Sequence, residues 1–253
     1  MSLSADLRGR RVLVTGASSG IGAAACRSIV SCGGSVAMLA RRKEKLETLH
    51  AELGDRSAPV PCDVTDLEGL AAAVETAARS LSGLDGVVAV AGRSMVGTIM
   101  TGTPERWREL IDLNLTGPLA TVRYAVDQFP ATGRRDVVMV SSTGALTPMA
   151  GVGVYAATKR GLRAAFDALR LELAPVGINV SCVMPGMFDT EGLSMDGVVF
   201  DGDIPPADIP WFASEGGPAA PGDLGDAIAF VISRPEGFCI NELVVRPTQQ
   251  LNP

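Results

Sequence analysis

Short apolar runs of strand type alternate with longer helical segments along most of the chain. The runs are Arg11–Val14, Ser35–Ala40, Ala58–Cys62, Val87–Val90, Val137–Val140 and Ile178–Val183, and a last one, Glu242–Arg246, follows a helical segment at 223–233. Strands that alternate with helices predict a parallel sheet with helices on both faces. We therefore expect one α/β domain over residues 1–253, a doubly wound parallel sheet of about seven strands flanked by helices.

Composition narrows the classes of function. The chain is 47% hydrophobic and 20% charged, which is enough apolar material for a sizeable core. A net charge of −6 does not supply the basic face of a nucleic-acid-binding protein, so we expect no nucleic-acid partner. The apolar runs are shorter than a membrane span, and the N-terminus has no hydrophobic signal segment. We expect a cytoplasmic protein with no membrane partner.

The small number of histidines and the spacing of the cysteines argue against several kinds of catalytic and metal site. His50 is the only histidine, so neither a Ser-His-Asp triad nor a His-rich zinc site is expected. The five cysteines are an odd number and form no Cys-x-x-Cys pair. We interpret them as small hydrophobic residues of the interior in a reducing compartment, and we expect no metal.

A glycine-rich turn follows the first strand. It reads Thr15-Gly16-Ala17-Ser18-Ser19-Gly20-Ile21-Gly22, and an alanine-rich helical stretch comes directly after it. Glycines let the backbone approach a ligand, and the N–H groups of a helix N-terminus attract an anion, so this arrangement favours a phosphate site. We expect cofactor contacts from Gly16, Ser18, Ser19, Gly20, Ile21 and Gly22.

The end of the second strand bears on the choice of cofactor. Dinucleotide folds often carry an acid here to bind the ribose 2′-hydroxyl, but this chain has Ala40 followed by Arg41 and Arg42. A small neutral residue leaves room for a 2′-phosphate, and arginine can bind a phosphate with a planar fork of donors. We expect NADP(H) to be favoured over NAD(H). The alternative is that these bases only begin a solvated helix.

Two further strand ends add candidate contacts. Asp63-Val64 follows the third strand, and Ala91-Gly92 follows the fourth. Thr65 and Glu68 have capping-box spacing, so Thr65 is expected to cap the next helix and to leave Asp63 free to accept a hydrogen bond from an adenine amino group. Small residues at Ala91-Gly92 would let the backbone lie against a ribose.

A tyrosine and a lysine are placed for acid–base chemistry. Tyr155 and Lys159 lie four residues apart, on one face of an expected helix. A nearby positive charge favours the phenolate, so Lys159 is expected to lower the pKa of Tyr155 toward neutrality, where a general acid or base works best. Ser142, after the fifth strand, could polarise the carbonyl oxygen of the substrate that Tyr155 protonates. A single Tyr-x-x-x-Lys is also common on surface helices.

The candidates gather at one edge of the expected sheet. Gly16–Gly22, Arg41, Asp63, Ala91, Ser142 and Pro185–Thr190 all follow the carboxyl end of an expected strand. Ligands of doubly wound sheets bind outside these ends. Asn114 lies in mid-helix, where asparagine is disfavoured, so it is either exposed or required there.

These residues resemble the short-chain dehydrogenase/reductase family of classical type, over nearly the whole chain. The glycine turn resembles the family's cofactor turn, and Asp63-Val64 its adenine contact. The catalytic tetrad is matched in order and spacing by Asn114, Ser142, Tyr155 and Lys159. Pro185, Gly186, Phe188 and Thr190 belong to a segment similar to the one that holds the nicotinamide carboxamide. The chain departs at Ala89-Val90-Ala91-Gly92, where the family usually has Asn-Asn-Ala-Gly, and the missing asparagines remove hydrogen bonds that steady the sheet.

The resemblance implies a Rossmann-like fold and reversible hydride transfer between NADP(H) and a carbonyl or alcohol. Tyr155 would pass the proton and also contact the cofactor, and Ser142 would hold the substrate oxygen. Lys159 would lower the tyrosine pKa and hold the nicotinamide ribose, while Asn114 would seat a water that links Lys159 to solvent. Such proteins are often homo-oligomers, tetramers or dimers, built through long helices, here near Pro104–Gln128 and Val154–Leu173.

Two other functions stay open from the sequence. One is a non-catalytic member of the same fold that senses the cofactor or scaffolds a partner, although such a protein has no need of all four tetrad residues. The other is a dehydratase or epimerase, for which no further acid–base residue is clearly placed. The C-terminal segment Ile240–Thr248 resembles family members that act on hydroxy acids.

A proline- and glycine-rich insertion at about 187–221 is expected to be a substrate lid. No lysine or arginine occurs between Leu171 and Ser233, whereas ten acids do. Clefts of one sign attract ligands of the opposite sign, so we expect a neutral or cationic, partly apolar ketone or aldehyde. The alternative is that the acids point outward and only keep the lid soluble. Apolar surface would come from Phe188, Phe200, Trp211 and Phe212.

Overall fold

Seven parallel strands form the central sheet, in the order β3-β2-β1-β4-β6-β7-β9. The chain is represented by a computed structural model that describes residues 5–147, 149–191, 198–202 and 217–250. The strands are β1 (Arg11–Thr15), β2 (Ser35–Ala40), β3 (Ser57–Pro61), β4 (Gly86–Ala89), β6 (Arg135–Val140), β7 (Ile178–Pro185) and β9 (Glu242–Val245). All neighbouring pairs are parallel, so the doubly wound α/β fold is confirmed.

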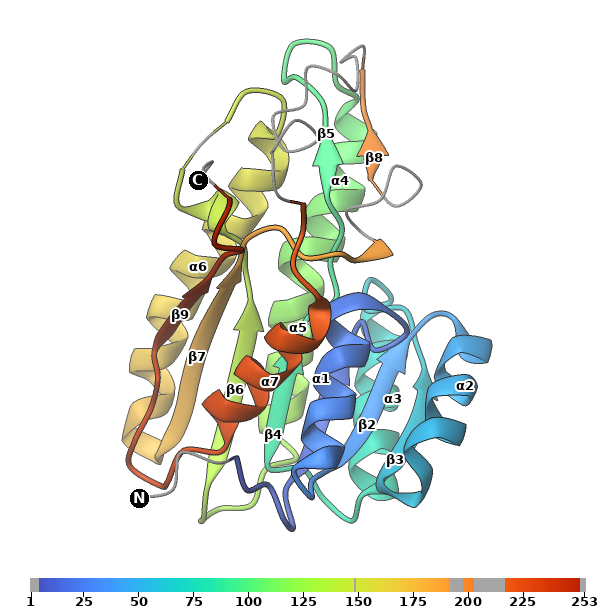
Figure 1. Cartoon of the computed structure of the whole chain (residues 1–253), viewed down its shortest axis with the longest axis vertical. Helices are drawn as coiled ribbons and strands as arrows, with labels where there is room; N and C mark the ends of the chain where they lie inside the picture. Colours follow the sequence, from blue (N-terminus) through green and yellow to red (C-terminus); the bar gives the residue numbers. More distant parts are fainter. Residues whose placement is uncertain (1–4, 148, 192–197, 203–216, 251–253) are drawn as a thin grey trace.

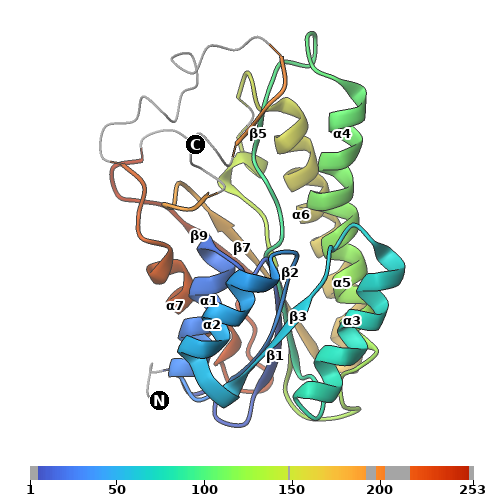
Figure 2. The same ribbon diagram turned by 90° about the vertical axis from the view of Figure 1, so that its right-hand side faces the viewer.

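Helices cover both faces of the sheet. One face carries α1 (Gly20–Ser31), α2 (Lys43–Leu53) and α7 (Pro221–Ile232), and the other carries α3 (Leu67–Ser80), α5 (Gly117–Val126) and α6 (Gly153–Leu173), as Figures 1 and 2 show. Helices α1 and α7 pack closely, because a Cβ at Gly225 would lie 2.7 Å from the Ala24 carbonyl group. Short helical turns occupy Gly54–Arg56, Thr143–Ala145 and Ala174–Val176.

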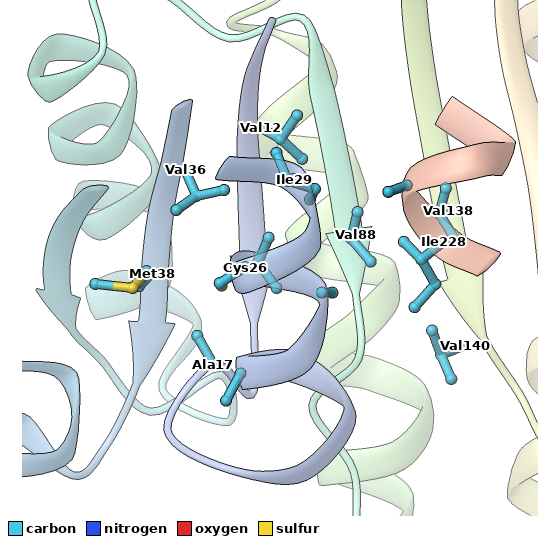
Figure 3. Packing of buried hydrophobic residues seen from close by; sticks show 14 of the residues in the cluster. Val12, Ala17, Cys26, Ile29, Val36, Met38, Val88, Val138, Val140 and Ile228 are labelled. Carbon is cyan, nitrogen blue, oxygen red and sulfur yellow. The ribbon is translucent and has the colours of Figure 1, made fainter. Parts of the chain in front are cut away.

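Two apolar layers hold the strands between these helices. Strands β1, β4 and β6 are buried on both faces, which explains their continuous apolar sequence. In the layer under α1 and α7, Val12, Val88 and Val138 of the sheet meet Ile29 and Ile228 of the helices (Figure 3). Burial of each such side chain contributes about 1.5–3 kcal/mol. This packing fixes where each strand ends, and therefore where the residues after it lie.

Part of the insertion forms a second, small sheet that the sequence pattern did not reveal. Strand β5 (Met95–Val96) pairs in parallel with β8 (Val199–Phe200). Asp201, only 3% exposed, then accepts hydrogen bonds from the Thr103 N–H (2.9 Å) and from the Trp107 ring N–H (3.0 Å). It thereby fastens the insertion to the start of α4 (Pro104–Ile111). Phe200 and Asp201 belong to this anchor.

The residue that caps α3 differs from the one expected. Asp66, not Thr65, caps α3, because its carboxylate accepts from the Gly69 N–H at 3.1 Å. Thr65 instead donates its N–H and its hydroxyl to Asp63, at 3.0 and 2.8 Å. The capping box was therefore placed one residue early, and Asp63 already has partners. His50 is half-buried, and its Nδ1 lies 2.8 Å from the Ser57 hydroxyl oxygen.

The helix expected near Pro104–Gln128 is one continuous rod with a π-helical segment inside it. Helix α4 passes through the π turn Asp112–Thr116 into α5. A π turn within a helix is frequent at functional sites, and this one presents Asn114 to the interior. Within the residues that the structure describes, no helix is both long enough and apolar enough to span a membrane.

Candidate functional site

The glycine turn between β1 and α1 has the shape of a dinucleotide cradle. Gly16 has φ +68°, and a Cβ there would lie 3.1 Å from the Ala91 backbone. A Cβ at Gly22 would lie 2.3 Å from the Gly16 carbonyl oxygen, so any side chain would fill the turn. The open space beside Gly20 and the start of α1 is where a pyrophosphate would be held by N–H groups. These residues fit a nicotinamide dinucleotide.

The arginines expected at the 2′-phosphate lie at the same cleft. Arg42 donates from Nη2 to the Ser18 and Ser19 hydroxyls at 2.9 and 2.7 Å. Arg41 is more exposed, with its Nη1 3.6 Å from Asp63. Burial raises the pKa of Asp63, but its hydrogen bonds from Thr65 and the charge of Arg41 outweigh burial and lower it. Both arginines and Asp63 line the cleft, together with Val64 and Gly92.

An acid closes this cleft from the opposite wall. Glu191, directly after Thr190, pairs with Arg42 at 2.5 Å and with Lys45. Hydrogen bonds from Lys45 and Arg42 lower the pKa of Glu191 to about 2. From the sequence, Glu191 was expected only as one of the acidic residues of the lid, and Lys45 was not expected at the cleft. Glu191 faces the adenosine side of the cleft.

The middle of the sheet is steadied without the family's asparagines. The Thr15 hydroxyl accepts hydrogen bonds from the Val90 and Ala91 N–H groups, both at 3.1 Å. Asn114 is fully buried and binds the Arg93 backbone, accepting from its N–H at 2.8 Å and donating to its carbonyl at 2.9 Å. The turn after β4 is thus held from two sides. This also answers why an asparagine lies in mid-helix.

Tyr155 meets two hydroxyl groups. Its hydroxyl lies close to the Ser142 side chain, as expected, and also to that of Ser94, which the sequence analysis did not identify. Ser142 is fixed in turn by a hydrogen bond from the Gly144 N–H at 3.1 Å. All three side chains line one pocket, which Gly92 and Lys159 extend toward the glycine turn. The expected hydroxyl pair is therefore a group of three.

Lys159 lies beside this group but does not act as expected on the tyrosine. Its ammonium donates to the Val140 carbonyl at 3.1 Å, and it lies close enough to Gly92 that a Cβ there would be 3.2 Å away. Burial lowers the pKa of Lys159 to about 8. Burial also raises the pKa of Tyr155, against the hydrogen bonds of Ser142 and Ser94. The expectation that Lys159 brings the Tyr155 pKa toward neutrality is wrong for this structure, because burial dominates.

The segment after β7 forms the far wall of the pocket. Pro185, Gly186, Phe188 and Thr190 all line it, as expected. Phe188 is 3% exposed and packs in the core, so it holds the segment in place. Gln250 reaches back from the C-terminal end, and its side-chain oxygen accepts from the Met187 N–H at 2.8 Å. Nothing in the sequence pattern pointed to Gln250.

The pocket around Tyr155 is mainly apolar. Val140, Met149, Val152 and Met187 contribute to its lining, and the described lining residues include two basic side chains, Arg93 and Lys159, and no acid. Of the acids expected to give the lid its field, Asp201 and Glu191 are engaged with α4 and α2 instead. Asp196, Asp203, Asp208, Glu215, Trp211 and Phe212 lie outside the described residues. The expected substrate charge stays a prediction.

Metal chemistry has no candidate in the described part of the chain. In those ranges no group of three or more histidines, cysteines, aspartates or glutamates lies together. The acid–base groups of the pocket around Tyr155 are Tyr155 itself and Lys159, with the Ser94 and Ser142 hydroxyls beside them.

Two comparisons place the chain among known protein sequences. Residues 10–196 match a family model described as short chain dehydrogenase. A glycine betaine reductase of Emericella nidulans is 33% identical over 253 positions, which are 96% of this chain but 19% of that protein. An uncharacterised oxidoreductase of Staphylococcus aureus (strain MW2) is 30% identical, with 93% of this chain and 96% of that protein aligned.

Solved structures agree with the fold. A short chain dehydrogenase from Burkholderia cenocepacia, in complex with NADP, superposes with a TM-score of 0.83 and 28% identity, covering 95% of this chain and 97% of that one. The similarity includes both the sheet and the region of the cleft, since it extends over nearly the whole chain.

Proposed function

This chain belongs to the short-chain dehydrogenase/reductase family of oxidoreductases, and on that basis we propose that it interconverts an alcohol and the corresponding ketone or aldehyde with NADP(H). One observation carries the proposal. The Tyr155 side chain, with Ser94 and Ser142 beside it, lies in a pocket that shares Gly92, Ile21 and Thr190 with the dinucleotide cleft. A substrate oxygen at the hydroxyls would therefore lie beside the reactive ring of a cofactor.

The role of each side chain follows from its surroundings. The cofactor, when bound, supplies or accepts the hydride. Tyr155 is protonated in this environment, because burial raises its pKa, and so it can donate a proton to a carbonyl oxygen during reduction. Ser142, fixed by the Gly144 N–H, can donate a hydrogen bond to the same oxygen. In alcohol oxidation the tyrosine would take the proton back.

Lys159 and Asn114 support this chemistry by binding the cofactor and by positioning the backbone, respectively. Lys159 is held at Gly92 by the Val140 carbonyl, where its charge can meet a nicotinamide ribose and phosphate. Asn114 fixes the Arg93 backbone through both halves of its amide, and so it positions the turn that carries Ser94. Its amide is engaged with protein atoms, so a positioning role is better supported than the water-seating role that the resemblance implied.

Cofactor choice follows from charge. Ala40 leaves room beside the ribose, and Ser18, Arg41 and Arg42 line the same part of the cleft. Charge-assisted hydrogen bonds contribute about 1.5–3 kcal/mol, so we expect NADP(H) to bind roughly tenfold or more tightly than NAD(H). The mainly apolar pocket favours a partly apolar substrate.

The test combines a substrate panel with a matched variant. NADPH oxidation would be followed by absorbance with ketones and aldehydes of different size and charge, in parallel with Tyr155→Phe. We expect turnover with at least one carbonyl, lost in the variant, and tighter binding of NADPH than of NADH. Full retention of turnover by Tyr155→Phe would contradict the mechanism, and equal dissociation constants would contradict the cofactor assignment.

A further inference from the structure

One acid joins the two walls of the dinucleotide cleft. Glu191 comes from the segment after β7, whereas Arg42 and Lys45 lie at the start of α2, about 150 positions earlier in the chain. The Glu191 carboxylate accepts from Arg42 Nη1 at 2.5 Å through one oxygen and from Lys45 through the other. Both carboxylate oxygens are therefore used, and the contact crosses the cleft that Ser18, Ala40 and Arg41 line.

The guanidinium of Arg42 has every nitrogen engaged. Nη1 donates to Glu191, while Nε and Nη2 donate to the Ser18 hydroxyl at 3.2 and 2.9 Å and Nη2 also to Ser19 at 2.7 Å. These contacts use four of its five N–H groups, so a phosphate that binds Arg42 through two N–H groups must replace one of these acceptors. A serine hydroxyl can rotate and donate to the phosphate instead. A carboxylate cannot, because it only accepts hydrogen bonds and carries the same sign of charge.

We propose that Glu191 is an internal competitor of the cofactor's 2′-phosphate, seated on Arg42 and Lys45 until NADP(H) displaces it. The inference rests on the proposed NADP(H) function. Like charges that share one cation repel each other, and the dianionic phosphate attracts the cations more strongly than a carboxylate does. NAD(H), with a neutral 2′-hydroxyl, leaves the Glu191 contacts in place. Glu191 therefore lowers the affinity for NADP(H) and not that for NAD(H), and so it sets the size of the cofactor preference.

The competitor is present at every working pH. Hydrogen bonds from Lys45 and Arg42 hold the pKa of Glu191 at about 2, so the carboxylate stays ionised from acidic to alkaline buffers. Its strength is limited by exposure, since the side chains of Glu191, Arg42 and Lys45 are 49%, 43% and 46% exposed. Ion pairs of this exposure change an equilibrium constant by about threefold to fivefold. That range sets the expected effect.

Glu191→Gln tests the proposal, and Glu47→Gln is the matched control. Glu47 lies on the same helix as Lys45 and pairs with Lys43, so its loss removes a nearby negative charge without touching the cleft contact. The dissociation constants of NADPH, NADH, 2′,5′-ADP and 5′-AMP would be measured by calorimetry at low and high salt. We expect Glu191→Gln to bind NADPH and 2′,5′-ADP about threefold to fivefold more tightly at low salt. NADH and 5′-AMP should change by less than about twofold, as should every ligand in the control.

Each other result has a distinct meaning. Weaker binding of both NADPH and NADH by Glu191→Gln would overturn the proposal, because Glu191 would then close over a bound cofactor instead of competing with it. Unchanged NADPH binding, with the wild-type preference for NADPH intact, would overturn the proposal and leave the proposed function standing. A wild-type protein that binds NADPH no more tightly than NADH would contradict the proposed cofactor itself.

Discussion

The two ends of the cleft are built in different ways. At the substrate end, backbone groups hold the side chains. Ser142 accepts a hydrogen bond from the Gly144 N–H, and the buried Lys159 donates one to the Val140 carbonyl. At the adenosine end, Arg42 and Glu191 are long, half-exposed side chains that pair mainly with other side chains. The first region is fixed before any ligand arrives, whereas the second can exchange partners.

This difference explains which physical effects dominate at each end. Burial sets the proton affinities of Tyr155 and Lys159, because their neighbours are mostly uncharged. Screened charge interactions govern the arginines, since water reaches them. Substitutions at the substrate end should therefore have large effects that salt does not change, and those at the adenosine end should have small effects that salt removes.

The largest effect is expected from removing the proton donor. Tyr155→Phe keeps the ring and loses only the hydroxyl, so turnover should fall by about 10²- to 10⁴-fold, the usual contribution of a positioned acid. NADPH should still bind within about twofold of wild type, because the adenosine end is untouched. Steady-state absorbance gives the first quantity and fluorescence titration the second. A variant with a tenth of wild-type turnover would show that another group passes the proton.

The next test uses pH to identify which group titrates. Burial lowers the pKa of Lys159 to about 8, so its charge is present below pH 8 and is lost as pH rises above it. The pKa of Tyr155 is raised, so the acid stays protonated through that range. The kcat/KM for NADPH, which reports groups of the free enzyme, should fall up to about tenfold per pH unit above pH 8. A profile that stays flat to pH 10 would contradict the assignment to Lys159.

A smaller effect is expected at the hydroxyl that the sequence reading missed. Ser94→Ala removes a hydroxyl group beside Tyr155, so kcat/KM for the carbonyl should fall about fivefold to tenfold, the effect of losing one neutral hydrogen bond in a buried site. Ser94→Thr keeps a hydroxyl and should recover most of the loss. Both variants should keep wild-type NADPH affinity. Equal kinetics of Ser94→Ala and wild type would show that Ser94 only lines the pocket.

The sequence was sufficient where function depends on the ends of strands. Apolar runs predicted all seven sheet strands, β2 at its exact bounds and the other six within two residues at either end, and parallel strands bring their carboxyl ends to one edge. The glycine turn, Ser142, Tyr155 and Lys159 were therefore found together. Gly16 could be recognised because its φ of +68° and the Ala91 backbone, 3.1 Å from the place of a Cβ, both favour glycine.

The sequence was insufficient where function depends on pairing over long separations or on burial. Glu191 and Gln250 meet their partners across 149 and 63 positions, and no periodic pattern marks either residue. The direction of the Tyr155 pKa shift was wrong because burial, which raises the pKa, cannot be judged from a lysine four positions away. Ser94 could have been found, because it follows the end of β4 by a few residues, where ligand contacts gather.

The smallest effects are expected from the two arginines, and their ranking sharpens the comparison. The Ser18 and Ser19 hydroxyls hold Arg42 at the cleft, whereas the Arg41 side chain is 66% exposed and only 3.6 Å from Asp63. Arg42→Ala should therefore reduce the NADPH-over-NADH preference about fivefold at low salt, and Arg41→Ala about twofold. Both losses should shrink at high salt, because exposed charges are screened. Dissociation constants of the two cofactors, measured at two ionic strengths, give the result. If the Arg41 variant lost more than the Arg42 variant, exposure and pairing in this structure would not determine how the adenosine end selects its cofactor.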